Sequence, residues 1–121
     1  MIYIKLPFNP PEGSNGCANA CFVRIRKGYE NDKGLISHEL LHIEQFWDNP
    51  LTHPFRYRFS PPYRLDCEVK AYRLQLSKPH PKYSVDERRE MYATWISAPG
   101  WKDGYDLQDI ITKEQALQLL S

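Results

Sequence analysis

The chain lacks any apolar run close to the roughly 20 residues that a membrane-spanning helix needs, and its formal net charge is only +1. The N-terminus has no basic start followed by a long apolar stretch, so no secretion signal is expected. A charge this close to zero gives no general electrostatic argument for nucleic acid or an anionic membrane as a partner. We therefore expect neither of these partners and predict a cytoplasmic protein, with its oligomeric state left open.

Cysteine is also scarce. The chain has three cysteines, which is an odd number, and no export signal is expected, so a disulfide framework is not suggested. Cys17 and Cys21 have a spacing that would suit a metal, but no second Cys or His pair at zinc-finger spacing follows them. We expect both to be reduced thiols and Cys67 to be a small buried residue. Internal repeats are lacking too, and 121 residues suit a single domain over residues 1–121.

The most informative feature that is present is the run HELLH at residues 38–42. Residues four apart on an α-helix lie about 40° apart around its axis, so His38 and His42 leave the same face. Two imidazoles and one further ligand hold Zn²⁺ with a fourth position open in catalytic zinc sites. Glu39 lies beside the first histidine, where it could take a proton from a water on the metal. The alternative is a metal-free pair of histidines on a helix flank.

The flanking residues favour a helix from about Asp32 to Trp47. A capping residue lies within residues 31–34, and Asn49 followed by Pro50 ends the pattern. Apolar residues recur at steps of three and four, which predicts one buried stripe along the helix. The members of this stripe are Ile36, Leu40, Ile43 and Trp47, with Leu35 beside them.

The remaining pattern predicts an α+β fold, in which a small N-terminal β-sheet packs on a helical core. Strands are expected at residues 1–6 and 20–27, the second with Cys21, Val23 and Ile25 on one face, and residues 7–19 are expected as a loop. Helices are expected at about 62–77, from Ser84 to Pro99, and after a Thr112/Gln115 cap. The linker at 48–62 contains the aromatic and arginine run 55–59. That run is either a nucleic-acid surface or a short strand or helical turn over the core.

A third ligand is required because two imidazoles alone bind zinc weakly. Glu68 is the candidate, since it lies on the second predicted helix, 26 residues after His42, with enough chain between for an antiparallel return. It shares a helix face with apolar residues that should turn inward, and a buried carboxylate needs a compensating partner. The alternative is an ordinary salt bridge from Glu68 to Arg64 or Arg73.

The HELLH helix, followed by the run YRLDCEVKAYRLQL at residues 63–76, resembles the gluzincin branch of zinc metallopeptidases. The resemblance covers about residues 35–76 and is closest in form to minimal, single-domain gluzincin-like proteins of phage and bacterial genomes. It implies a minimal zincin-like fold with an antiparallel pair of site helices. It further implies His38, His42 and Glu68 as zinc ligands and Glu39 as general base. It also places an edge strand for extended substrates at residues 21–27.

The sequence departs from this family at one position. Larger gluzincins carry an aspartate four residues after the ligand glutamate, which orients the first histidine. Here that position is Tyr72, so we expect its hydroxyl to bond an imidazole nitrogen instead. Candidates for stabilising charge in the transition state are His53, Arg56, Tyr57 and Tyr63.

Three functions remain compatible with these residues. The first is a zinc-dependent peptidase or amide hydrolase acting on a peptide or protein. The second is a zinc-binding interaction or assembly module without turnover, and the third is a metal-free helical binding domain. If the chain is encoded by a phage, host lysis would release it from the cytoplasm.

Overall fold

A three-stranded sheet forms the N-terminal part of the computed structural model, which describes residues 2–121. Its strands are β1 (Ile4–Lys5), β2 (Gly16–Asn19) and β3 (Phe22–Ile25), in the order β1-β3-β2. β3 is central, with β1 parallel to it and β2 antiparallel to it. The strand expected at residues 1–6 is thus reduced to two residues, and Met1 lies outside the described residues.

The hairpin between β2 and β3 differs from the prediction. Residues 16–19 were expected as a loop but form β2, and the strand expected at 20–27 is shorter because Ala20 lies in the tight turn with φ 53°. The small, polar residues of β2 give no local strand signal, so its pairing with β3 determines its structure. Val23 and Ile25 are buried on one face, as predicted.

Helix α1 (Lys33–Asp48) confirms the predicted helix to within one residue. The Asp32 side chain caps it by accepting a hydrogen bond from the Leu35 backbone N–H at 3.1 Å. Leu35 and Ile43 pack on the buried face of the sheet. The prediction that Trp47 enters the core is wrong. Its side chain is 42% exposed, and the indole N–H donates to the Ile2 carbonyl at 2.7 Å.

The predicted linker contains a short helix, α2 (His53–Phe59), which supports the helical-turn alternative. Ser60 then caps α3 (Pro61–Leu76), which agrees with the second predicted helix to within a residue. His53, which the sequence places in the linker at 48–62, is instead the first residue of α2, and Pro54 lies in the first turn, where proline is tolerated.

The C-terminal helices are α4 (Val85–Ser97), α5 (Gly100–Asp103) and α6 (Lys113–Leu119). Ser84 caps α4, and Thr112 with Gln115 forms a capping box on α6, both as predicted. The four-residue α5 was not predicted. A helix-side apolar cluster joins α3, α4, α6 and the segment before α6: Tyr72, Tyr92, Ala93, Ile96, Leu107, Ile111, Ala116 and Leu120.

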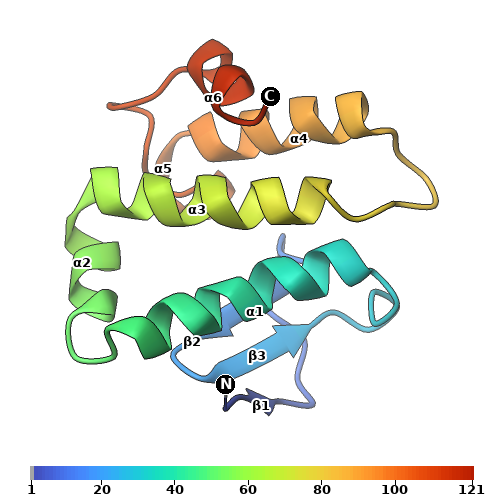
Figure 1. Ribbon diagram of the computed structural model, residues 1–121, viewed down its shortest axis with the longest axis vertical. Helices are drawn as coiled ribbons and strands as arrows, with labels where there is room; N and C mark the ends of the chain where they lie inside the picture. Colours follow the sequence, from blue (N-terminus) through green and yellow to red (C-terminus); the bar gives the residue numbers. More distant parts are fainter. Residues whose placement is uncertain (1) are drawn as a thin grey trace.

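Figure 1 shows the sheet, α1, α3 and the α4/α6 pair following one another across the molecule, with α1 and α3 running in opposite directions. A sheet-side apolar cluster of Val23, Ile25, Leu35 and Ile43 lies on one side of α1. The helix-side cluster lies beyond α3, and the two are separate. Within residues 2–121 no helix is long and apolar enough to cross a bilayer. The α1–α3 interface, between the two clusters, holds the polar residues of the candidate site.

Candidate metal centre

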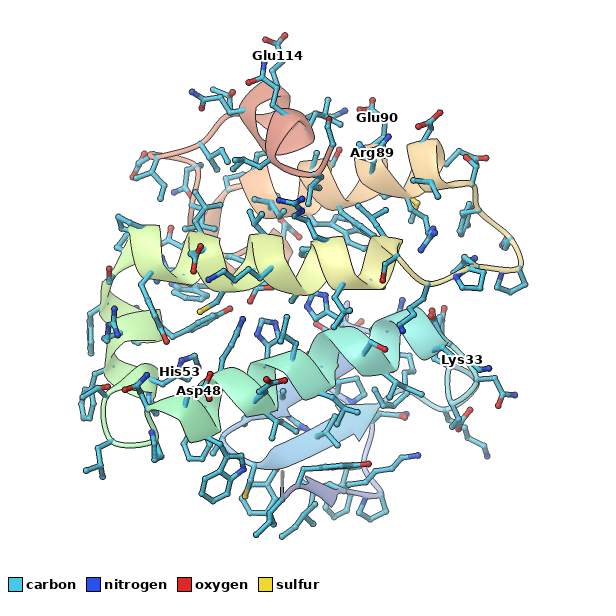
Figure 2. The ribbon with its side chains drawn as sticks, viewed as in Figure 1. Lys33, Asp48, His53, Arg89, Glu90 and Glu114 are labelled. Carbon is cyan, nitrogen blue, oxygen red and sulfur yellow. The ribbon has the colours of Figure 1, made fainter. Side chains whose placement is uncertain are left out.

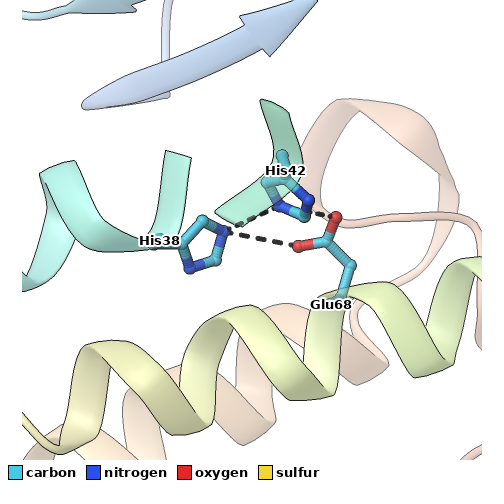
Figure 3. A group of neighbouring side chains, drawn as sticks. All are labelled: His38, His42 and Glu68. Atoms are coloured by element: carbon cyan, nitrogen blue, oxygen red, sulfur yellow. Dashed lines mark hydrogen bonds and ion pairs between the residues drawn. The ribbon is translucent and has the colours of Figure 1, made fainter. Parts of the chain in front are cut away.

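Three predicted ligands meet between α1 and α3. His38 and His42 project from one face of α1, and Glu68 reaches them from α3 (Figure 3). The two Nε2 atoms are 3.1 Å apart. Glu68 Oε1 is 3.5 Å from His38 Nε2, and Oε2 is 3.2 Å from His42 Nε2. The one-turn spacing of the histidines on α1 and the antiparallel return of α3 produce this convergence.

These donors fit a metal ion. Ligands about 2.0–2.1 Å from a tetrahedral ion such as Zn²⁺ lie about 3.3–3.4 Å apart, and the three contacts here span 3.1–3.5 Å. Glu68 is 1% exposed, yet its Oε1 has no hydrogen-bond partner among residues 2–121. A buried carboxylate oxygen whose nearest donor is an imidazole nitrogen 3.5 Å away is costly, and a cation would remove that cost. The group could therefore hold a metal ion.

The alternative salt bridges of Glu68 are not formed within the described residues. Arg64 is buried and donates instead to the main-chain carbonyls of Tyr57, Arg58, Tyr105 and Asp106. Arg73 is exposed on α3. Glu68 pairs with imidazoles rather than with guanidinium groups.

The charges of the site act strongly on one another. Burial works to lower the pKa of His42, but the charge of Glu68 and its hydrogen bond outweigh this and raise it to about 9. For Glu68, burial would raise the pKa, whereas the two imidazoles hold it well below its usual range. The site therefore keeps Glu68 as a carboxylate, which is the form that binds cations.

Two neighbouring side chains hold the ligands from outside. The Gln45 Oε1 atom lies 3.0 Å from His42 Nδ1, and the Gln45 amide nitrogen donates to the Cys67 carbonyl at 3.3 Å. The Tyr57 hydroxyl donates to Glu68 Oε2. Burial keeps the pKa of Tyr57 well above its ordinary value, so this hydroxyl stays protonated and remains a donor.

The predicted bond from Tyr72 to an imidazole nitrogen is wrong. Its hydroxyl meets that of Tyr105 at 2.5 Å, inside the helix-side cluster. The Tyr72 ring instead packs edge-on against His38, with centroids 4.4 Å apart. His38 Nδ1 has no hydrogen-bond partner among the described residues. Ring packing thus takes the place of a hydrogen bond at His38 Nδ1.

Glu39 lies on the side of α1 that faces the sheet. It is 5% exposed, and a Cβ atom added at Gly16 of β2 would lie 2.9 Å from its Oε2 atom. Burial raises the pKa of Glu39, against the opposing charges of His38 and His42. The strand beside it is β2, an edge strand, so the expectation that residues 21–27 form the edge is wrong: β3 is paired on both sides.

A cleft of about 230 Å³ opens beside His42. Its lining includes the β2–β3 turn at residues 18–20, Phe46 of α1, and three residues of α2, His53, Pro54 and Tyr57. Figure 2 shows His53 at the start of α2 and Asp48 at the end of α1. His53 Nδ1 contacts the Tyr63 hydroxyl at 2.6 Å. Burial, with the charges of His42 and Arg56, lowers the pKa of His53.

Two site residues escaped the sequence reasoning. Gln45 follows His42 by three residues, so helical spacing could have placed it beside that ring. Gly16 could not have been found, because its contact with Glu39 depends on how the hairpin packs on α1.

Comparison of the chain with protein-family models, with curated proteins and with solved structures found no match. The gluzincin resemblance thus rests on residues 35–76 and on the site that they form.

Proposed function

We propose that this chain is a zinc-dependent peptidase or amide hydrolase with a minimal, gluzincin-like site. The observation that carries the proposal is the convergence of His38, His42 and Glu68, with a buried acid, Glu39, next to the first histidine. Two imidazoles and a carboxylate are a donor set used by catalytic zinc sites, which keep a fourth position open. A purely structural site has no use for a buried acid at that position.

A zinc ion held by these ligands would polarise a scissile carbonyl and make a water molecule more acidic. Glu39 would accept the proton of the attacking water and later pass it to the leaving amine. Its raised pKa suits this task, because a group that must gain a proton should not be a very weak base. Its position between α1 and β2 would keep bulk water from competing for the proton.

His53 is the best candidate for stabilising the charge that develops on the carbonyl oxygen. It lines the cleft beside His42, and its contact with Tyr63 fixes the orientation of the ring. Arg56 lies over the Tyr63 ring, 4.2 Å from its centroid, which holds that tyrosine in place. Tyr57 is engaged by Glu68, so it supports a ligand rather than the substrate.

The walls of the cleft support a peptide as the substrate. The outer edge of β2 has main-chain groups that no other strand of residues 2–121 pairs with. An extended peptide could add there as a further strand, passing along the cleft beside His42. A folded protein surface would not reach buried ligands, so a peptide or an unfolded segment of protein is the expected substrate.

The test is a pair of measurements on purified protein and on Glu39→Gln. The native chain should contain about one zinc ion per molecule by elemental analysis and should cleave unfolded protein or cell-wall peptides. Glu39→Gln should keep the zinc and lose cleavage, because the amide cannot accept a proton. Turnover that persists in this variant would remove the assignment of Glu39, and absence of zinc from the native chain would remove the whole proposal.

One observation favours a second candidate, a zinc-binding assembly module without turnover. The ligands lie at the interface between two separate apolar clusters, where an ion would tie α1 to α3. A zinc-containing native chain that cleaves nothing, but unfolds when zinc is removed, would favour this module over the peptidase.

A further inference from the structure

Gln45 forms a link between the second histidine and the opposite helix. Its side chain contacts the His42 ring, one turn back on α1, and the main chain of Cys67 on α3. Cys67 directly precedes Glu68, so one glutamine touches one ligand and the residue next to another. Gln45 itself does not line the cleft.

The Cys67 carbonyl determines which way the Gln45 side-chain amide is turned. A carbonyl oxygen can only accept a hydrogen bond, so the Gln45 amide nitrogen must face Cys67. The Gln45 oxygen is then the atom 3.0 Å from His42 Nδ1. An amide oxygen can only accept, so His42 Nδ1 must carry the hydrogen.

We propose that Gln45 is a positioning residue that fixes the His42 tautomer, and thereby presents the Nε2 lone pair to the metal. The inference rests on the proposed zinc site but does not depend on catalysis. With its hydrogen on Nδ1, a neutral imidazole has its lone pair on Nε2, the atom that faces Glu68 and His38. Gln45 would also orient the His42 ring relative to α3, because its amide nitrogen is hydrogen-bonded to the Cys67 carbonyl of that helix.

The two histidines differ in this respect. His38 Nδ1 is buried without a hydrogen-bond partner among the described residues, so its tautomer is not fixed by a protein acceptor. Zinc affinity should therefore depend on the hydrogen bond at His42 Nδ1, since His38 Nδ1 has no corresponding hydrogen bond among the described residues. This asymmetry makes Gln45 a sensitive position.

The experiment compares the native chain with Gln45→Leu, Gln45→Glu and Gln75→Leu. Leucine removes both contacts, whereas glutamate keeps an oxygen for His42 and loses the donor to Cys67. Gln75 is the matched control, because it is a buried glutamine of the same interface that lies against Gly34 of α1 and forms no hydrogen bond to a ligand within residues 2–121. The dissociation constant for zinc is measured by competition with a chromophoric chelator, and the His42 ring nitrogens by ¹H–¹⁵N spectra of the zinc-loaded proteins.

Gln45→Leu should weaken zinc binding about 10- to 100-fold, the range typical of lost outer contacts. The slowly exchanging His42 Nδ1–H signal of the native protein should disappear. Gln45→Glu should keep that signal and recover most of the affinity, and Gln75→Leu should resemble the native chain.

The inference is overturned if Gln45→Leu binds zinc as tightly as the native chain with its Nδ1–H signal unchanged, or if Gln75→Leu loses as much affinity. If Gln45→Leu fails to fold, Gln45→Glu decides, since loss of its Nδ1–H signal would overturn the role. A native chain that binds no zinc defeats the proposed function, whereas a native chain that binds zinc but is indifferent to position 45 defeats only this inference.

Discussion

Gly16 lies where the edge strand approaches Glu39 most closely. A Cβ atom there would come within 3.0 Å of the Glu39 side chain and of Leu35 Cδ1, distances that real Cβ atoms rarely show. The small space there favours glycine, whereas its backbone conformation does not, because Gly16 has no positive φ. The position of the candidate base depends on a residue that has no side chain.

The first prediction concerns Gly16→Ala. The added methyl group should displace the Glu39 carboxylate, and turnover should fall by about tenfold or more because small misplacements of reacting groups are costly. Zinc content should not change, since no ligand is touched. Asn15→Ala, an exposed neighbour, is the control. Full turnover in Gly16→Ala would show that Glu39 is not held against the strand during the reaction.

At the scale of elements, α2 carries three residues of the cleft, and one of them, Tyr57, donates to Glu68. Arg64 holds this helix in place, because its guanidinium reaches the Tyr57 and Arg58 carbonyls on one side and the Tyr105 and Asp106 carbonyls on the other. The carbonyls at the end of a short helix would otherwise lack partners. The orientation of α2 thus depends on a residue of α3.

The second prediction is that Arg64→Met destabilises the chain by about 3 kcal/mol, because several buried carbonyls lose a charged donor at once. Chemical denaturation monitored by circular dichroism measures the loss. Arg58→Met is the matched control. Arg64 and Arg58 both lie over the Trp101 ring, at 4.5 and 5.1 Å from its centroid, but the Arg58 side chain is exposed. Equal destabilisation by the two variants would contradict the role given to the carbonyl contacts.

The elements that could be predicted are those with local signals. Helix α1 has the Asp32 cap at one end and Asn49 followed by Pro50 at the other, so its bounds were readable. β2 has no such signal, because its residues become a strand only by pairing with β3. Helix α2 was hidden by the prolines around it, which are typical of loops and also of first helical turns.

The site could be predicted as far as local geometry reaches. The pairing of His38 with His42 follows from helical spacing, and Glu68 follows from the cost of a charge on an inward face. The outer contacts could not be predicted in the same way. Tyr57 reaches Glu68 only because α2 crosses the ends of α1 and α3 (Figure 1), and Tyr72 turns to Tyr105, 33 residues away.

At the scale of the whole molecule, two apolar clusters lie on opposite sides of a polar interface. α1 and α3 meet there through histidine, glutamate and glutamine side chains and through the close approach of Gly34 to Gln75. Ala71, three residues after Glu68, is fully buried on the same helix face. The free energy that such a polar interface gains from apolar burial is smaller, for the same buried area, than that of an apolar cluster.

The third prediction concerns metal removal and pH. In the metal-free protein the pKa of His42 is raised from 6.5 to about 9. Its ion pair with Glu68 therefore contributes fully below pH 6.5 and is lost as the pH rises through about 9. The free energy of unfolding should fall by an amount on the order of 3 kcal/mol over this range.

Denaturant titrations with a chelator and with saturating zinc measure this effect. The zinc-loaded protein should be more stable throughout and should lose less stability at high pH, because zinc requires a neutral imidazole and replaces the ion pair. A metal-free protein whose stability is flat across this range would contradict the pairing of His42 with Glu68.

The polar interface between the clusters has a consequence for the lifetime of the chain. A copy deprived of its ion would keep its two apolar clusters but lose the ion between α1 and α3, and partial opening there would expose the surrounding loops to cellular proteases. Metal depletion would then lower the amount of the protein as well as its activity, because metal-free copies would be degraded first.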